Sequence, residues 1–559
     1  RYLDLARFET LTQTEPITRA ELNRLLGAAP AQVRSLLETE GYFSADSSIS
    51  LLRDGSGSGA VETVQLQLVV LPGPRTQVGQ VDLQARGALA DAAAAGNADA
   101  QALLQRLRQD WRLPTGRPFL QADWSEAKTR VLTLLRAEGY ATPAWLSTEA
   151  RVQPAEQRAD LLLQIDSGPL HRIGPLRYEG LEHVEADALR ALLTFTPGEP
   201  LREQPLQDYQ ERLVRTGLFD TVSVVALPAT GQTEVPVTVR LGERALHQIT
   251  LGLGVSDSTG PRVTLEHLNQ ALLGYGWQAR SKLQYGRDAQ SIALDLTSHP
   301  KPGPYRNLIS GALTRTEAGG LQVTGEKLRL GRTQDTEQIE RLYYFEWQRA
   351  LTRPVDGGPI SDDVSSLSYN YQWVWRDLDS AILPTRGVSA SAEAGFGHSF
   401  HTASDSGWFS RGTARLTGYW PFGASWYGQA RLQLGQVVPT SVSVPYTLLF
   451  RAGGDDSVRG YAYQSLGPSD AAGTALGGRV LATSSVELAR PVSPQLASVW
   501  MAAFVDAGGA ALDWQSYQAA LGYGLGLRWR SPVGPLRIDV AYGEALRRWR
   551  LHFTVGVTF

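Results

Sequence analysis

Several segments in the last third of the chain alternate strictly between apolar residues and small or polar ones. In residues 521–529 every second residue is leucine or aromatic, and the residues between them are glycine or arginine. The same period of two recurs in residues 536–543 and 551–559, and earlier in residues 251–255 and 367–375. Successive side chains of a β-strand point to opposite faces, so each segment predicts a strand with one apolar face and one small or polar face.

An apolar outer face and a polar inner face are typical of a barrel that crosses a membrane with strands. No run of 18 apolar residues occurs, and the most apolar window, Leu496 to Val505, has about half the length of a membrane-spanning helix. Only a barrel could therefore span a bilayer. A soluble β-sandwich is the alternative, but aromatic residues recur near the strand ends, as they do at membrane interfaces.

We expect the barrel to begin near Glu243. The 317 residues from Glu243 to Phe559, at roughly 20 per strand and connection, give about 16 antiparallel strands.

The N-terminal half has a different period and repeats itself. Leucines at helical spacing occur in residues 22–26 and 103–107, which predicts an α+β fold. The run Leu-Leu-Glu-Thr-Glu-Gly-Tyr at residues 36–42 recurs as Leu-Leu-Arg-Ala-Glu-Gly-Tyr at residues 134–140, and more loosely at residues 213–219. In each copy we expect a helix to end at the glycine. The glycines lie 98 and 78 residues apart, which fits whole small domains rather than short solenoid repeats.

Two Gly-Pro pairs, at residues 73–74 and 168–169, follow strand-like runs and indicate domain junctions. We therefore predict four domains. They comprise residues 1–72, 73–167, 168–242 and 243–559. The Gly/Ser-rich residues 55–59 predict a flexible hairpin tip within the first domain. The first residues show no basic region followed by an apolar core, so we expect any export signal to have been removed.

Composition excludes several function classes. The 53 basic and 56 acidic residues nearly balance, so we expect no nucleic-acid partner held by bulk charge. The absence of cysteine excludes thiolate metal sites and thiol catalysis. The eight histidines are scattered, and no HExxH, GxSxG or GxxxxGK(S/T) pattern occurs. We expect neither an enzyme nor a metal, nucleotide or redox cofactor; the run Gly-Tyr-Gly-Leu-Gly at residues 522–526 lies inside an alternating strand and is no dinucleotide loop.

The most informative run is Arg-Ala-Gly-Gly-Asp-Asp-Ser-Val-Arg-Gly-Tyr at residues 451–461. It does not alternate like a strand, and its glycines allow a sharply folded loop. Arg459 then lies at the tip as a permanently charged group suited to paired hydrogen bonds. Taken alone, the run could also be an exposed surface loop with an ordinary arginine.

The end of this run resembles the VRGY/VRGF motif of barrels that carry POTRA domains, the superfamily of BamA, TamA and the two-partner secretion transporters. The four residues of the motif are Val458, Arg459, Gly460 and Tyr461. The resemblance implies that this loop folds back into the barrel lumen. It also implies that Arg459 meets acidic residues of the inner wall, for which the matching positions are Asp506 and Glu487.

Other parts of the chain are similar to the same superfamily. They include residues 383–387, which would open a central strand, and residues 531–539 near the end. The last strand resembles the C-terminal signal that directs barrel assembly. The residues that carry this resemblance are Phe553, Gly556 and Phe559. The N-terminal half resembles three POTRA modules, which is the number in TamA-like members, although the chain begins inside the first module and lacks its opening strand.

The resemblance implies an outer-membrane translocation and assembly factor with its POTRA domains in the periplasm. Client outer-membrane proteins, autotransporters among them, would be inserted or translocated at a lateral seam between the first strand, residues 247–256, and the last, residues 551–559. Lipid movement is a second cargo that the sequence leaves open. The first-strand positions we assign to the seam are Ile249, Leu251 and Leu253. Gly556 is the candidate weak point of the last strand.

The implied partners are a TamB-like periplasmic protein anchored in the inner membrane, the client proteins, and the phospholipid and lipopolysaccharide bilayer. The alternative is a two-partner secretion transporter, which would export one dedicated protein through its lumen. Such a transporter usually begins with a plug helix, for which we find no sequence. A plain porin would need no POTRA repeats.

Overall fold

The computed structural model describes most of the chain. The described ranges are residues 3–4, 18–53, 64–229, 231–256, 260–303, 305–336, 338–380, 384–401, 405–423, 425–439, 443–470, 476–496, 498–531 and 534–558. Two compact units are present. One holds residues 1–179, 194–211 and 223–240, and the other holds residues 180–193, 212–222 and 241–559. None of the described helices is long and apolar enough to cross a membrane.

In the described residues 18–53 and 64–71, the first domain has one long helix and a pair of strands. Helix α2 (Arg19–Thr39) starts where the Thr18 side chain accepts a hydrogen bond from the backbone N–H of Glu21. It ends before Gly41, whose φ of 88° is the left-handed conformation that glycine adopts without strain. Strands β1 (Asp46–Arg53) and β2 (Val64–Leu71) pair antiparallel. The predicted Gly/Ser tip at residues 55–59 falls outside the described residues.

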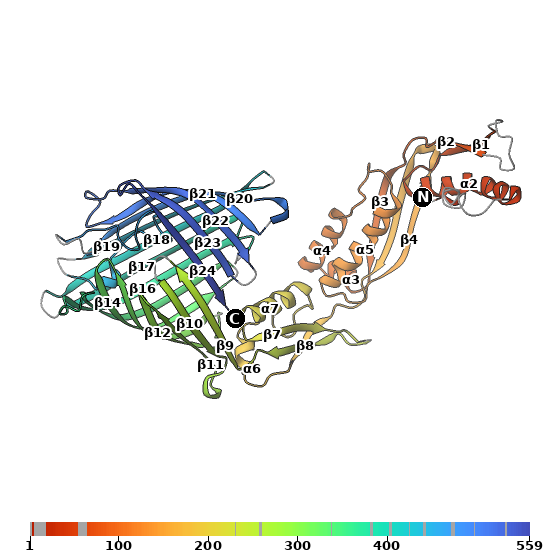
Figure 1. The fold of residues 1–559 in the computed structure, drawn as a ribbon. Helices are drawn as coiled ribbons and strands as arrows, with labels where there is room; N and C mark the ends of the chain where they lie inside the picture. Colours follow the sequence, from red (N-terminus) through yellow and green to blue (C-terminus); the bar gives the residue numbers. More distant parts are fainter. Residues whose placement is uncertain are drawn as a thin grey trace. The chain divides into compact units, whose positions relative to one another are not determined.

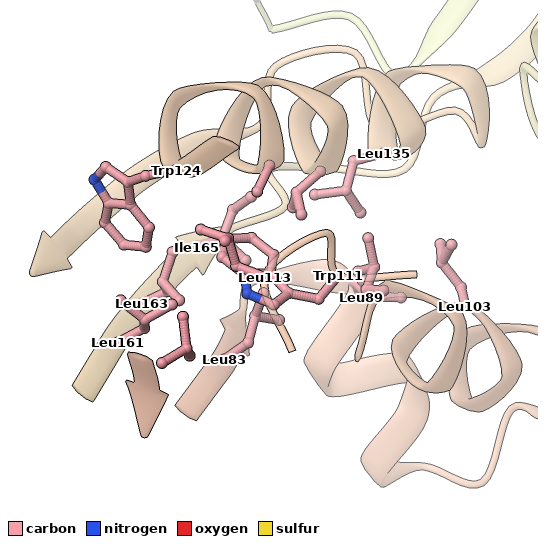
Figure 2. Close-up of a cluster of buried hydrophobic side chains, with 14 of the residues drawn as sticks. Leu83, Leu89, Leu103, Trp111, Leu113, Trp124, Leu135, Leu161, Leu163 and Ile165 are labelled. Carbon is pink, nitrogen blue, oxygen red and sulfur yellow. The ribbon is translucent and has the colours of Figure 1, made fainter. Parts of the chain in front are cut away.

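The second domain packs helices against a three-stranded sheet. Its elements are β3 (Gln77–Arg86), α3 (Ala88–Ala94), α4 (Ala98–Gln109), α5 (Gln121–Ala137), β4 (Ala144–Gln153), the 3₁₀ turn η2 (Pro154–Glu156) and β5 (Arg158–Asp166). The strand order is β3-β5-β4, with β3 parallel to β5. Apolar side chains of the central strand β5, Leu161, Leu163 and Ile165, meet Trp124 and Leu135 of α5 in one buried core (Figure 2).

The third module repeats this topology. Its elements are β6 (Arg172–Glu179), α6 (Ala186–Arg190), α7 (Glu203–Arg215), β7 (Phe219–Ala226) and β8 (Glu234–Glu243). The strand order is β6-β8-β7, and β6 again runs parallel to β8. The second and third modules therefore share one topology, which corresponds to the repeats in the sequence. Helices α5 and α7 each end two residues before a glycine with positive φ, Gly139 and Gly217 respectively.

Glu243, the last residue of β8, fixes the segment before α6 by hydrogen bonds. Its carboxylate accepts hydrogen bonds from the backbone N–H groups of Glu182, His183 and Val184 at 2.9–3.1 Å. Burial by itself raises the pKa of Glu243, but these N–H groups outweigh it, so the pKa lies below its ordinary value of 4.5. The carboxylate therefore stabilises the fold above about pH 4.5, and this contribution disappears as the pH falls through the lower folded-state pKa.

We expect Glu243→Gln to speed hydrogen exchange of the amides of Glu182, His183 and Val184 about tenfold near neutral pH, because an ionised acceptor is replaced by a neutral one. Mass-spectrometric exchange on wild type and variant measures this. The difference between the two proteins should vanish once the pH has fallen through the folded-state pKa of Glu243, which lies below 4.5, because the wild-type carboxyl group then loses its charge as well. A difference that persists unchanged in acid would contradict this role for the carboxylate.

Residues 247–558 form one closed antiparallel barrel of sixteen strands, as predicted (Figure 1). The strands are β9 (His247–Ser256), β10 (Gly260–Asn269), β11 (Trp277–Gly286), β12 (Ala289–Ser298), β13 (Tyr305–Ala318), β14 (Leu321–Asp335), β15 (Ile339–Pro354), β16 (Asp362–Leu378), β17 (Gly387–His401), β18 (Gly407–Phe422), β19 (Trp426–Pro439), β20 (Val480–Pro491), β21 (Val499–Ala511), β22 (Ala520–Ser531), β23 (Gly534–Gly543) and β24 (Arg548–Thr558). Short 3₁₀ turns are η3 (Leu272–Gly274), η4 (Tyr446–Leu448) and η5 (Pro494–Leu496).

The first strand has its predicted bounds, but the last starts three residues earlier than Leu551. Arg548 pairs with Gly543 of β23, so the ladder continues through the basic residues that precede Leu551. The alternation divides the two faces as expected. Leu525 and Leu527 are 67% and 47% exposed on the outer face, whereas Asp539 of the neighbouring strand is 4% exposed on the inner one.

Candidate functional site: a loop arginine in the lumen and the closing seam

The connection from β19 to β20 enters the barrel and is fixed first to the wall of β15, β17 and β18. The Ser399 hydroxyl donates to the carbonyl of Ser443 at 2.6 Å, and Thr447 donates to the amide oxygen of Gln348 at 3.2 Å. The guanidinium of Arg411 donates to the carbonyl of Leu448 at 3.3 Å. Apolar residues of the connection also join those of the wall in a buried cluster of Phe409, Val437, Val444, Leu448, Phe450, Ala452 and Leu481.

The motif loop then folds sharply on glycine. Gly453 and Gly454 both have φ of 103°, and the N–H of Gly453 donates to the hydroxyl of Ser457 at 2.8 Å. Gly460 has φ of 94°, and a Cβ there would lie 2.7 Å from the backbone nitrogen of Gly543. Only glycine combines this backbone conformation with so close an approach to the wall.

This fold brings Arg459 to the inner wall at Asp506 of β21. The Nε of Arg459 donates to Asp506 Oδ2 at 2.7 Å, one terminal nitrogen donates to Oδ1 at 2.9 Å, and the Arg459 backbone N–H adds a third bond at 3.0 Å. Both residues are buried, with 5% and 0% of their surface exposed. The guanidinium also lies 3.3 Å from the ring centroid of Phe504. A charge-assisted, two-pronged pair in a restricted space is a strong and directional contact.

Two further carboxylates and a second arginine complete the cluster. Arg459 reaches Glu487 of β20 at 3.0 Å and Asp539 of β23 at 3.4 Å. Arg528 of β22 bridges the same two carboxylates at 2.8 and 2.5 Å. Two guanidinium groups thus hold three carboxylates of neighbouring strands, and loss of either cation leaves negative charge without compensation in a buried place.

The glycines of β22 make room for the loop. A Cβ on Gly522 would lie 1.9 Å from the carbonyl oxygen of Arg459, and one on Gly526 would lie 1.8 Å from a carboxylate oxygen of Asp539. The inner face of this strand must therefore stay without side chains where the loop tip and its carboxylates are seated.

The other motif residues are buried as well. Val458 and Tyr461 are 0% and 1% exposed, and the Tyr461 hydroxyl donates to the carbonyl of Leu521 at 3.0 Å. The N–H of Gly460 donates to a ring nitrogen of His552 at 2.9 Å. Sequence reasoning named Asp506 and Glu487 but missed three members of the cluster, although the alternation had already put all three on the polar face. They are Arg528, Asp539 and His552.

Among the described residues, the seam between β24 and β9 is the shortest ladder of the barrel. Five described residue pairs close it, from Thr554↔Ser256 to Thr558↔Gly252. Every other neighbouring pair of strands has between eight and fifteen. Gly556 lies opposite Gly254 in the middle of this ladder.

The predicted seam residues divide into two groups. Leu253 pairs with β24, whereas Ile249 and Leu251 lie in the half of β9 before the ladder, 70% and 42% exposed. Phe553 is half-buried in β24, one residue before the ladder starts, and Phe559 falls outside the described residues. The luminal loop touches the same place, because Thr554 donates to a carboxylate oxygen of Asp455 at 2.7 Å.

Within the described ranges no group of three or more histidine, aspartate or glutamate side chains is arranged to hold a metal ion. The polar cluster of the lumen is an arginine–carboxylate network.

Comparison with known proteins identifies the family. A family model described as the Omp85 superfamily domain matches residues 271–559, more than half of the chain, and a POTRA model described as a surface antigen variable number repeat matches residues 171–244. The outer membrane protein assembly factor BamA of Neisseria meningitidis serogroup B is 25% identical over 489 residues, which cover 74% of this chain and 60% of that protein. BamA of Nitratidesulfovibrio vulgaris is 23% identical over 435 residues, 74% of this chain and 53% of that one.

The chain thus spans less than two thirds of the length of these relatives. Among solved structures, BamA from Haemophilus ducreyi lacking POTRA domains 1–3 aligns with a TM-score of 0.68 at 19% identity, over 86% of this chain and 100% of that one. CdiB from Acinetobacter baumannii aligns with a TM-score of only 0.49. The chain belongs to the Omp85 superfamily, which indicates a bacterial outer-membrane barrel preceded by periplasmic POTRA domains.

Proposed function

We propose that this protein is a TamA-like translocation and assembly factor, which inserts or translocates client outer-membrane proteins at the seam between β24 and β9. The observation that carries the proposal is the short ladder of five residue pairs at this seam. Since each pair of strands is held by its hydrogen bonds, the ladder with the fewest pairs opens at the lowest cost.

The first strand also offers a template. In the described part of the chain, residues 247–251 of β9 pair with β10 on one side and have no β24 partner on the other. An unpaired strand edge can accept a further strand by β-augmentation, which supplies main-chain hydrogen bonds whatever the client sequence. Gly252, Gly254 and Gly556 add little side-chain packing to the ladder, which favours its opening.

The modules before the barrel support the same assignment. We propose that α2 and the hairpin β1–β2 belong to the first of three POTRA modules, the number in TamA-like members. Their partner would be a TamB-like protein anchored in the inner membrane, with client barrels and membrane lipids as the other partners. The proposed action is mechanical, by strand exchange, and needs no catalytic group or cofactor.

The alternative function is export of a dedicated protein through the lumen. The luminal loop argues against it as the resting arrangement, because one end of the connection is fixed to β15, β17 and β18 and its tip is fixed to β20–β23. A polypeptide could pass only after both sets of contacts had broken.

A disulfide across the seam tests the proposal directly. Gly254 and Gly556 lie opposite each other, so Gly254→Cys with Gly556→Cys can lock the ladder in a chain that has no cysteine of its own. We expect the insertion rate of client proteins into proteoliposomes to fall at least about tenfold in the oxidised protein and to recover on reduction, because the ladder stays closed and the edge of residues 252–256 stays covered by β24.

The matched control is Gly252→Cys with Thr264→Cys, which cross-links β9 to β10 one ladder away. This control should insert clients equally well in its oxidised and reduced forms. Full activity of the oxidised seam variant would rule out lateral insertion and would favour passage through the lumen.

A further inference from the structure

Two histidines lie at the start of the unpaired edge of β9. His247 is the first residue of this strand, and His267 lies on the neighbouring strand β10. The Nδ1 atom of His247 and the Nε2 atom of His267 are 3.0 Å apart, and the two ring planes differ by 13°. The rings therefore form an N–H···N hydrogen bond, which fixes the orientation of His247.

Both rings belong to the outer face of the barrel. His267 is paired with Ile249, which is exposed on that face, and His247 shares the face because it lies two residues before Ile249 on the same strand. Glu266, the residue before His267, belongs to the opposite face and forms an ion pair with Arg280 at 3.3 Å. Its carboxylate is therefore not a partner of the two histidines.

The histidine pair keeps at least one N–H group for another partner. In the neutral pair each ring carries one proton, and one of these two protons lies between the rings. The second proton lies on an outer nitrogen, either Nε2 of His247 or Nδ1 of His267. A third proton gives the pair a positive charge and an N–H group on each outer nitrogen. In the part of the chain that the structure describes, no other hydrogen bond engages these outer nitrogens.

The seam shows how an incoming strand lies when it continues the ladder along β9. Strand β24 runs antiparallel to β9, and its pairs proceed from Thr554↔Ser256 to Thr558↔Gly252. The C-terminal end of β24 therefore points toward His247. A client strand that pairs with residues 247–251 in the same direction ends beside His247, where facing side chains of neighbouring strands are about 5 Å apart.

We propose that His247 binds a carboxylate at the C-terminal end of the incoming client strand, and that His267 is its positioning partner. The inference rests on the proposed function, because it names the feature of the client that the β9 edge recognises. An imidazole N–H that donates to a carboxylate forms a charge-assisted hydrogen bond, which is stronger than a bond to a neutral acceptor. The carboxylate belongs either to the chain terminus or to an aspartate or glutamate at the same place.

Peptide binding to the full chain in a non-ionic detergent tests the proposal. The probe is the synthetic peptide Leu-His-Phe-Thr-Val-Gly-Val-Thr-Phe, which has the sequence of residues 551–559 and carries a fluorophore on its N-terminus. We expect fluorescence anisotropy to show that its free acid binds about tenfold more tightly than its C-terminal amide.

Two further amides distinguish the sources of the carboxylate. They end in glutamate and in glutamine in place of the last phenylalanine. Tighter binding of the glutamate amide than of the glutamine amide identifies a site that also accepts a side-chain carboxylate. Equal binding of these two, together with a preference for the free acid, identifies a site for the chain terminus.

His247→Leu should lower the affinity for the free acid about tenfold and leave the affinity for the phenylalanine amide unchanged, since leucine fits the apolar outer face but has no N–H group. His267→Leu should reduce the preference for the free acid as well, because His247 then loses the bond that orients its ring. The matched control is His398→Leu on the outer face of β17, which should bind both peptides as wild type does. Unheated gel migration checks that each variant keeps a folded barrel.

The outcomes separate this role of His247 from the proposed function. Equal binding of the free acid and the amide by wild type would show that the edge accepts a strand without recognising a carboxylate, and would overturn the role of His247 alone. The role is also overturned if His247→Leu keeps the preference for the free acid or weakens both peptides equally. If neither peptide binds to wild type, strand addition at β9 is itself contradicted, and both proposals fail.

Discussion

Arg459→Ala is expected to lower the free energy of unfolding of the barrel by about 3–5 kcal/mol, the usual cost of removing one partner of a buried ion pair. The cost arises mainly from what stays behind. Asp506 is fully buried and loses the two hydrogen bonds from the Arg459 side chain, and the third bond, from the backbone N–H of residue 459, is no longer supported by a side-chain pair that holds the loop tip in place. Arg528 stays in contact with Glu487 and Asp539, at 2.8 and 2.5 Å, and so leaves the charge of Asp506 without its own arginine.

Samples are heated to increasing temperatures before gel electrophoresis. The measurement is the temperature at which the fast-migrating band of the folded barrel is replaced by the slow-migrating band of the unfolded chain. The matched control is Arg349→Ala, which breaks an equally short pair with Asp363 at 2.8 and 2.7 Å. That pair is 39% and 20% exposed, so its loss should cost at most about 1 kcal/mol. Adding Asp506→Ala to Arg459→Ala should recover part of the stability, because the fully buried carboxylate that Arg459 had paired is then removed as well. Equal transition temperatures for Arg459→Ala and the control would contradict the importance of burial here.

The barrel could be predicted because the alternation of apolar and polar residues is visible in the sequence of each strand separately. Residues 247–256 alternate cleanly, and β9 has these bounds. The last strand was predicted to start three residues too late: Arg548 and Arg550 continue its inner face, while Trp549 between them is 66% exposed on the outer one. In a barrel with a polar lumen, arginine on alternate positions does not end a strand.

The arginine cluster could be predicted only in part, for a physical reason. Alternation tells which face a side chain occupies but not which residues of neighbouring strands lie at the same height, because that depends on register and shear. Asp506 and Glu487 were found through the family motif. Asp539 was on the right face of its strand, and only the pairing of Gly526 with Asp539 brings its carboxylate level with Arg528 and the loop tip.

Gly522→Ala should displace the tip of the motif loop from the barrel wall, although it removes no charged group. The added Cβ would lie 1.9 Å from the carbonyl oxygen of Arg459, and the nearest atoms are backbone that cannot rotate away. Overpacking of this kind costs about 1–3 kcal/mol, and the loop can relieve it by leaving the wall. We therefore expect the variant to lose both barrel stability and the contact between the loop and β24.

Loop seating can be read out separately from stability, because the chain has no cysteine and Asp455 and Thr554 are in contact. With Asp455→Cys and Thr554→Cys, a short bifunctional maleimide should join the loop to β24 rapidly in the parent protein and at least about tenfold more slowly when Gly522→Ala is added. Gly412→Ala is the matched control, since a Cβ on Gly412 of β18 meets nothing within 4 Å. It should leave cross-linking unchanged. A different result would contradict this prediction: Gly522→Ala lowers stability but cross-links at the parent rate. In that case the loop tip would stay at the wall, and strand β22 would be the element that shifts to accommodate the added methyl group.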